Sequence, residues 1–310
     1  MMTFAGSHTV LVTGARGFLG RHVARCFAAA GHTVSGIGHG EWRRDEHSAY
    51  GISTWHQADI TLERLVQVAG EPDCIVHCAG SSSVGFSLTN PLEDFDRSAT
   101  TTVAVLDYVR RVTPNTAVVL PSSAAVYGTA ILLPNNESAP LRPASPYGVH
   151  KLIVEELCQS YAKHFKTRLA IVRLFSLYGE GLRKQLMWDA CKKFASGAAE
   201  FFGSGEELRD WLHVEDAAKL LHKAALNASS LCPVVNGGSG QGISVGRALS
   251  LLASTYGTLE PLSFTGEKRA GDPTGYQADI TAANQWGWEP RIPLDEGLQR
   301  YVRWFKELSQ

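Results

Sequence analysis

The sequence predicts an α/β fold built on a doubly wound parallel sheet, followed by a smaller mixed α/β region. Three observations support this prediction. Short apolar strands alternate with helical segments through the first half of the chain, a pattern typical of parallel sheets covered on both faces. A glycine-rich loop follows the first strand. After Phe175 the pattern changes to short elements separated by Gly, Pro and Trp. Right-handed crossovers then make the doubly wound topology the economical one.

Each element follows from a local pattern. Apolar, mostly β-branched runs bounded by turn residues predict strands over 8–13, 33–37, 74–78, 117–120, 169–175 and 234–236. Apolar residues spaced three or four positions apart predict helices over 18–30, 92–112, 147–165, 185–196, 214–227, 244–256 and 294–308. Pro121 is expected to close the strand over 117–120, and the helix over 92–112 ends before Pro114.

Composition narrows the classes of function. The 310 residues carry 29 Lys+Arg and 30 Asp+Glu, a net charge of −1, so no basic excess is available for nucleic acid. No apolar stretch is long enough to cross a membrane, and the first residues lack a signal-peptide pattern. The six cysteines form no CxxC pair, and we expect them to be reduced. We therefore expect a cytoplasmic protein with no membrane contact and no metal.

The glycine loop is the segment Thr13-Gly14-Ala15-Arg16-Gly17-Phe18-Leu19-Gly20, between the first strand and the first helix. Such glycines permit a tight turn, close approach of a pyrophosphate, and packing of helix on sheet. Glycine triplets also occur in plain turns, and the placement between strand and helix favours the phosphate site. The loop predicts a Rossmann-type dinucleotide site. Its expected contacts are Gly14, Arg16, Gly17, Phe18, Leu19 and Gly20.

The end of the second strand bears on the choice of cofactor. An acid there would hold the adenosine ribose of NAD, but the expected position is Gly38. Arg16, His39, Arg43 and Arg44 are nearby in the sequence, and an arginine can pair with a 2′-phosphate. We therefore expect NADP(H) to be preferred, with NAD(H) as the alternative. On that alternative the two later arginines are solvated charges, and Glu41 or a backbone group serves NAD.

Asp59 and Ile60 follow a further expected strand, where an adenine amino group would bind. An equally strong interpretation makes Asp59 a cap for the helix that starts after Thr61.

The catalytic candidates are Ser123, Tyr147 and Lys151. Tyr147 and Lys151 stand four apart on an expected helix, hence on one face. The ammonium would lower the pKa of the tyrosine toward neutrality and make it a usable acid and base. Taken alone, the pair is also compatible with an ordinary surface contact. Ser123 follows a central strand, at the sheet end where ligands bind, and would hold a sugar hydroxyl whose proton Tyr147 takes.

These segments together resemble a known family. The glycine loop, the Ser122-Ser123-Ala124-Ala125-Val126-Tyr127-Gly128 run, Tyr147-x-x-x-Lys151 and the 209–216 segment Arg-Asp-Trp-Leu-His-Val-Glu-Asp are similar to the extended short-chain dehydrogenase/reductase family. The resemblance covers roughly residues 8–305. The group most resembled contains the nucleotide-sugar epimerases, dehydratases and reductases.

The resemblance implies roles for individual residues. Ser123, Tyr147 and Lys151 would be catalytic, with Lys151 also binding the nicotinamide ribose. Further cofactor contacts would be Cys78, Ala79 and Gly80. Arg209 and Arg269 would bind a nucleotide diphosphate. The full set of expected substrate contacts is Ser81, Ser123, Ser176, Lys184, Gln185, Phe202, Arg209 and Arg269, although Phe202 is equally suited to a core position.

Two departures from the family pattern limit the reaction. Ala124 and Ala125 stand where 4,6-dehydratases carry an Asp-Glu pair, and alanine cannot exchange protons. The family's usual Asn in the 97–102 segment is absent, which leaves its contact to Ser98. We therefore expect a nucleotide-sugar epimerase acting through a 4-keto intermediate, with an NADPH-dependent 4-keto-sugar reductase as the alternative. A dehydratase or a non-catalytic cofactor-binding regulator is less well supported.

The chain is expected to contain a dinucleotide-binding domain with the catalytic residues over 1–175 and a mainly substrate-binding region over 176–310. Some later segments are expected to return to the sheet. By resemblance, the helices over 92–112 and 147–165 would pair in a homodimer.

Overall fold

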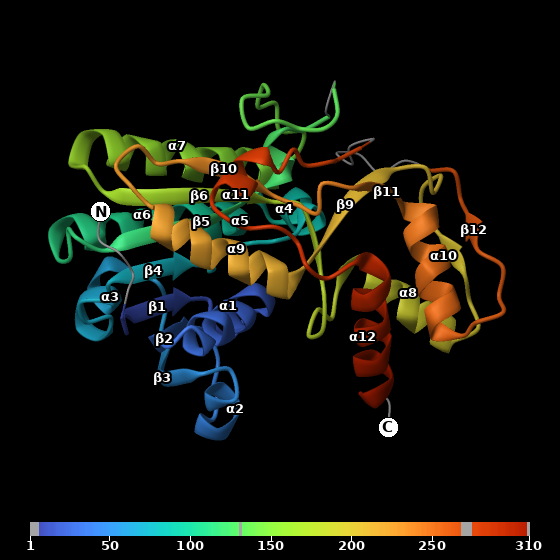
Figure 1. Ribbon diagram of the computed structural model, residues 1–310, viewed down its shortest axis with the longest axis horizontal. Helices are drawn as coiled ribbons and strands as arrows, with labels where there is room; N and C mark the ends of the chain where they lie inside the picture. The colour runs from blue at the N-terminus through green and yellow to red at the C-terminus, as the bar shows by residue number, and fades with distance from the viewer. Residues whose placement is uncertain (1–5, 130–131, 268–274, 309–310) are drawn as a thin grey trace.

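The computed structural model describes residues 6–129, 132–267 and 275–308. Its centre is a seven-stranded sheet in the order β10-β6-β5-β4-β1-β2-β3, with every pair parallel (Figure 1). The strands are β1 Thr9–Thr13, β2 Thr33–Gly38, β3 Ile52–Gln57, β4 Cys74–His77, β5 Ala117–Ser123, β6 Arg168–Leu174 and β10 Val234–Gly237. The strand order reverses at β1, and the predicted doubly wound class is confirmed.

Helices cover both faces of this sheet. Figure 1 shows α1 and α9 side by side across one face. The elements of that face are α1 Phe18–Ala29 and α9 Val214–Asn227. The elements of the other face are α3 Leu62–Val68, α6 Thr101–Arg111 and α7 Pro146–Phe165. Short helices α2 Arg44–Ser48, α4 Val84–Thr89, α5 Pro91–Phe95 and α11 Thr281–Gln285 fill connections.

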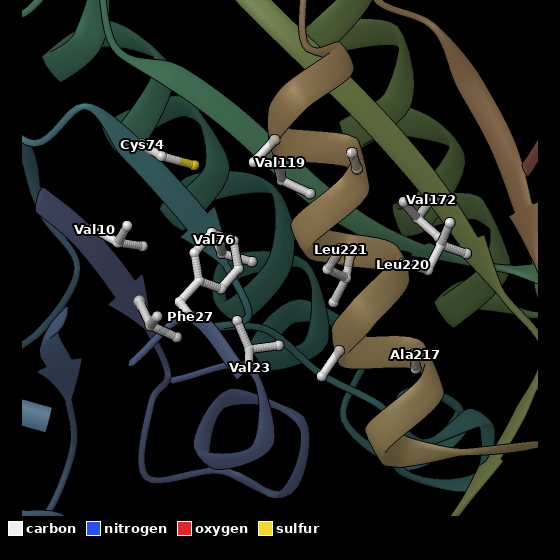
Figure 2. Packing of buried hydrophobic residues seen from close by; sticks show 14 of the residues in the cluster. Val10, Val23, Phe27, Cys74, Val76, Val119, Val172, Ala217, Leu220 and Leu221 are labelled. Carbon is white, nitrogen blue, oxygen red and sulfur yellow. The ribbon is translucent and has the colours of Figure 1, made fainter. Parts of the chain in front are cut away.

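Alternating side chains on the strands create two cores. Val10, Val76, Val119 and Val172 face α1 and α9, where Phe27 and Leu220 meet them (Figure 2). Their neighbours on the strands face the opposite side. That second core contains Leu11, Ile75, Val118 and Ile171 from the strands and Leu65, Leu106, Val154 and Cys158 from the helices. A fully buried parallel sheet therefore explains the continuous apolar runs in the sequence.

The C-terminal elements have a core of their own. β7 Ser176–Tyr178, β9 Leu208–His213 and β11 Gly242–Ser244 form a three-stranded sheet, and β8 Glu200–Phe201 pairs with β12 Ser263–Phe264. Three helices gather at one end of the molecule (Figure 1): α8 Gln185–Ala195, α10 Val245–Tyr256 and α12 Leu294–Glu307. Buried residues of this core include Met187, Phe194, Leu249 and Tyr301.

Two predicted element boundaries were wrong, each for a local reason. β5 does not close at Pro121 but continues to Ser123. Beyond Val119 the strand pairs only with β6, so the missing N–H of proline costs no hydrogen bond to β4. The predicted helix over 92–112 is broken into α5, a π-helical turn at Asp96–Thr100, and α6. A π-turn inside a helix often marks a functional site.

The predicted boundary after residue 175 does not coincide with the edge of the large sheet. Both α9 and β10 come later in the chain, yet they belong to the large sheet and its cover. Within the described residues, no helix combines the length and apolar character that a membrane span needs.

Candidate active site

The glycine loop forms a tight cradle, and two of its glycine positions leave no room for a side chain. Gly14 has φ +63°, and a Cβ there would lie 2.8 Å from the backbone of Ala79. A Cβ at Gly20 would lie 2.7 Å from Ala15 Cα. The Gly14 N–H donates to Ile37 O at 2.8 Å, which joins the loop to β2. Since α1 starts at Phe18 immediately after Gly17, its free N–H groups face this cradle, which fits the pyrophosphate of a dinucleotide.

The end of β2 carries mixed charges. Gly38 leaves no acid on the strand, and a Cβ at Gly40 would collide with the Arg16 guanidinium, which therefore lies over this turn. His39 Nδ1 lies 3.2 Å from Asp59 Oδ1, with both side chains exposed. Arg16 and the His39–Asp59 pair thus both lie at the end of β2.

Contacts bear on two of the alternatives at this end of the sheet. Arg43 pairs with Asp45 at 3.1 Å and Glu46 at 3.3 Å, which favours its interpretation as a surface charge. The Thr61 hydroxyl, not Asp59, caps α3 by accepting from Arg64 N at 3.2 Å. Ile60 is buried in the core beneath.

Ser123, Tyr147 and Lys151 come together where β5 ends and α7 begins. The Ser145 hydroxyl caps α7, accepting from Gly148 N at 3.2 Å. A Cβ at Gly148 would lie 2.7 Å from Ala125 O, so this first turn packs on the segment that follows Ser123. The Lys151 Nζ donates to Pro121 O at 3.2 Å and lies 5.9 Å from the centre of the Tyr147 ring. The i,i+4 spacing therefore places both side chains on one face, as predicted.

The electrostatics differ from the prediction at Tyr147. Burial raises the pKa of Tyr147 to about 12, although the neighbouring Ser123 hydroxyl acts in the opposite direction. The expected lowering of the Tyr147 pKa toward neutrality is not found, because burial dominates. Burial also lowers the pKa of Lys151, while the negative charge of Asp94 raises it. The phenol therefore stays neutral at ordinary pH, and the Lys151 ammonium beside it is desolvated.

The turn after β4 connects the glycine cradle with Lys151. Ala79 N donates to the Thr13 hydroxyl at 3.2 Å, and a Cβ at Gly80 would lie 3.9 Å from Lys151 Nζ. Ser81 N donates to the Ser98 hydroxyl at 3.3 Å. Ser98 thus holds this turn from the π-helical segment, at the position where the family pattern has an Asn. Burial raises the pKa of the Cys78 thiol to about 12, which makes it a packing residue and not a nucleophile.

The expected substrate contacts divide into two groups. Lys184 Nζ donates to the Ser82 hydroxyl at 2.6 Å, and Gln185, with φ +68°, donates to Ser82 O at 3.5 Å. These two residues therefore approach the turn after β4, next to Ser81. A non-glycine residue in a left-handed conformation at such a place is a common mark of a functional site.

The other group belongs to the C-terminal strands and their connections. Ser176 begins β7, paired with Trp211 of β9, and the Arg209 guanidinium stacks on Tyr276 at 5.8 Å. Phe202 follows β8 and is partly exposed. Arg269 lies outside the described residues.

A buried polar network behind Ser123 was missed by the sequence analysis. Arg173 of β6 donates to Glu155 Oε2 at 2.8 Å and to the Tyr127 hydroxyl at 3.0 Å. Ser122 donates to the same Glu155 carboxylate. Two signals were present: Arg173 lies inside an otherwise apolar strand, and Glu155 follows Lys151 by four positions. A charge in a buried pattern implies a partner.

The fold and the glycine cradle define a Rossmann-type dinucleotide-binding protein, with a hydroxyl, a phenol and an ammonium at the carboxyl end of its central strand. Residues 10–236 match the model of the NAD dependent epimerase/dehydratase family. The chain belongs to that family. The resemblance to the nucleotide-sugar group of extended short-chain dehydrogenases/reductases is thereby confirmed.

Relatives span nearly the whole chain. UDP-glucose 4-epimerase of Mycolicibacterium smegmatis is 28% identical over 312 residues, covering 97% of this chain and 99% of the relative. UDP-glucuronic acid decarboxylase 1 of Xenopus tropicalis is 26% identical, covering 96% of this chain and 72% of the relative. Among solved structures, MoeE5 in complex with UDP-glucuronic acid and NAD is 27% identical with a TM-score of 0.85, covering 97% and 99% of the two chains.

Proposed function

We propose that this protein is a nucleotide-sugar 4-epimerase that uses Tyr147 as acid and base. The observation that carries the proposal is the convergence of Tyr147, Ser123 and Lys151 on the sheet end beside the glycine cradle. The M. smegmatis relative is named as a UDP-glucose 4-epimerase, and MoeE5 was solved with a UDP-sugar. Both support a UDP-hexose as the first substrate to test.

Each residue has a defined task in this proposal. Gly14, Gly17 and Gly20 admit the pyrophosphate, and Lys151 holds the nicotinamide ribose. The bound nicotinamide supplies the hydride acceptor and, in the return step, the donor. Ser123 hydrogen-bonds the 4-hydroxyl, and Tyr147 in its ionised form takes the hydroxyl proton as C4 gives up its hydride, which together gives a 4-keto sugar. After the sugar turns in the pocket, Tyr147 returns the proton to the 4-oxygen as C4 is reduced from the other face.

A second candidate is a 4-keto-sugar reductase, which one observation favours. The raised pKa of Tyr147 keeps the phenol protonated at neutral pH, and this form donates a proton to a 4-keto oxygen. Neither candidate requires an acid at positions 124 and 125, whereas 4,6-elimination does. A dehydratase is thus the less suited alternative.

Product analysis separates the two candidates. Purified protein is incubated with UDP-, dTDP-, GDP- and CDP-hexoses at catalytic cofactor levels, and products are resolved by NMR. We expect a C4 epimer to accumulate from at least one UDP-hexose. Stoichiometric NADPH consumption on a 4-keto sugar, without epimer formation, would instead identify the reductase. No turnover in either assay would refute both.

The dinucleotide preference depends on Arg16. NAD is the cofactor in the family description and in MoeE5, while the NADP(H) preference is still a prediction from Gly38 and Arg16. Because Arg16 lies over the turn at Gly40, we expect Arg16→Ala to weaken NADP(H) by roughly tenfold, the value of one charged hydrogen bond. NAD(H) affinity should change little. Tighter binding of NAD(H) by the wild type, with both affinities unmoved by Arg16→Ala, would contradict the preference.

The assembly and location are also proposals. A homodimer through α6 and α7 is supported by the exposed apolar side chains Val103, Val149 and Phe165 on those helices. The cytoplasm is the proposed location, consistent with six free cysteines.

A further inference from the structure

A buried carboxylate lies beside the proposed catalytic pair. Asp94 of α5 is 0% exposed. Its Oδ2 accepts from His150 Nδ1 at 2.6 Å, while its Oδ1 has no hydrogen-bond partner among the described residues. His150 stands between Tyr147 and Lys151 on α7 and also meets the Phe95 ring edge-on at 5.4 Å. A fully buried carboxylate with one unpartnered oxygen is costly, so its retention calls for a reason.

We propose that Asp94, oriented by His150, is a positioning residue whose negative charge fixes the protonation states of Lys151 and Tyr147. The proposal rests on the proposed roles of Tyr147 and Lys151. His150 holds Asp94 by a charge-assisted hydrogen bond from the helix that carries both groups. This contact joins residues 56 positions apart and leaves the second carboxylate oxygen unpaired in the low-dielectric interior, where a charge acts most strongly.

The direction of the effect follows from the sign of the charge. Asp94 raises the pKa of Lys151, opposing the lowering by burial, and it also raises the pKa of Tyr147. Asp94 therefore favours the ammonium form of Lys151 in a desolvated site and the phenol form of Tyr147. Removing the charge should lower both pKa values together.

Few other charged groups surround Tyr147 and Lys151. Arg97 and Asp96 of the π-helical turn are exposed, and Arg97 pairs with Glu93. α4 carries no titratable residue. His77 is held by the Thr13 hydroxyl at 2.7 Å, and burial lowers its pKa to about 3, so it stays neutral. The remaining groups acting on Lys151 are Cys78 and Glu155. Asp94 acts in the same direction on Lys151 and on Tyr147, since it raises the pKa of both.

The test is the pH profile of Asp94→Asn, which removes the charge at nearly constant shape. Both limbs of the kcat/KM profile on the epimerised sugar should move to lower pH. Glu93→Gln, one residue away on the exposed side, is the matched control and should leave both limbs in place. If Asp94→Asn lowers kcat/KM at every pH without moving either limb, Asp94 has a merely structural role and the proposal is overturned.

A second readout needs no substrate. In protein with ¹³C-labelled lysine ε-carbons, the Lys151 signal is assigned from Lys151→Arg and titrated by NMR. Its pKa should fall in Asp94→Asn and in His150→Ala, and His150→Gln, which retains a donor for Asp94, should restore it. An unchanged Lys151 pKa in Asp94→Asn would overturn the proposal. Because this titration is independent of turnover, failure of the epimerase assay in the wild type would refute the proposed function without deciding the role of Asp94.

Discussion

Tyr147→Phe is expected to lower turnover by roughly 10²–10⁴-fold, the usual contribution of a positioned acid–base group. The substitution removes only the phenolic oxygen, which Ser123 approaches and which burial keeps protonated. The backbone contact that holds this turn, Tyr147 N to the Ser87 hydroxyl at 3.0 Å, is unaffected. Turnover is measured on the sugar that the product screen identifies, and dinucleotide affinity is measured in parallel.

The same substitution at Tyr161 provides the control. Tyr161 lies on the same helix and meets the Phe165 ring edge to face, with the ring centres 5.0 Å apart. Tyr161→Phe should leave turnover within a factor of about two. Should Tyr147→Phe retain wild-type turnover, Tyr147 would not be the acid and base, and the proposed mechanism would have to be abandoned.

Arg173→Met is expected to lower the free energy of unfolding by about 3–5 kcal/mol, the cost of leaving a buried charge without its partner. Arg173 makes bonds to Glu155 Oε1 and Oε2 between 2.8 and 3.2 Å, and the two side chains are nearly inaccessible. Removing the guanidinium leaves the buried Glu155 carboxylate behind Ser123 without its charged partner. The loss is measured by urea denaturation followed by circular dichroism.

Two further variants test whether the stability lost in Arg173→Met comes from the unpaired buried charge. Arg168→Met changes the first residue of the same strand, where the side chain is partly exposed and donates to Asn115 O at 3.3 Å. It should cost far less, about 0.5 kcal/mol. Replacing Arg173 and Glu155 together by Met and Leu should recover much of the loss, since no unpaired charge remains. Equal losses in Arg173→Met and Arg168→Met would show that the buried pair contributes little.

The sequence predicted the sheet well because strands buried on both faces appear in the sequence as continuous apolar runs. α9 has the predicted bounds, since its apolar positions face the core over its whole length. The predicted strand ended too early because proline normally ends a central strand. Only the register shows that the pairing between β4 and β5 stops at Val119, before Pro121. The π-helical turn was missed because its 3.6-residue pattern looks continuous. At the start of α6, the Thr101 and Thr102 hydroxyls donate back to the Arg97 and Ser98 carbonyls of this turn at 2.7 Å.

The site was predictable where spacing along one element decides it, and not where distant elements meet. Tyr147 and Lys151 follow from a four-residue interval, and Ser123 from its place at a strand end. The Asp94–His150 contact joins two helices, so no local period reveals it. The charge environment of Tyr147 was misjudged for the same reason. Spacing gives the direction of a side chain, whereas burial and a carboxylate on another helix set its pKa.

Because α9 and β10 return to the large sheet, they affect how the protein unfolds. A fragment ending at residue 175 would lack β10 at the edge of the sheet and α9 over β5 and β6. Val119 and Val172 would then meet water in place of Leu220 and Leu221. Neither part is a separable module, because the second completes the core of the first. The protein should accordingly unfold in one cooperative step, and substitutions in α9 or β10 should destabilise the strands and helices that precede residue 175.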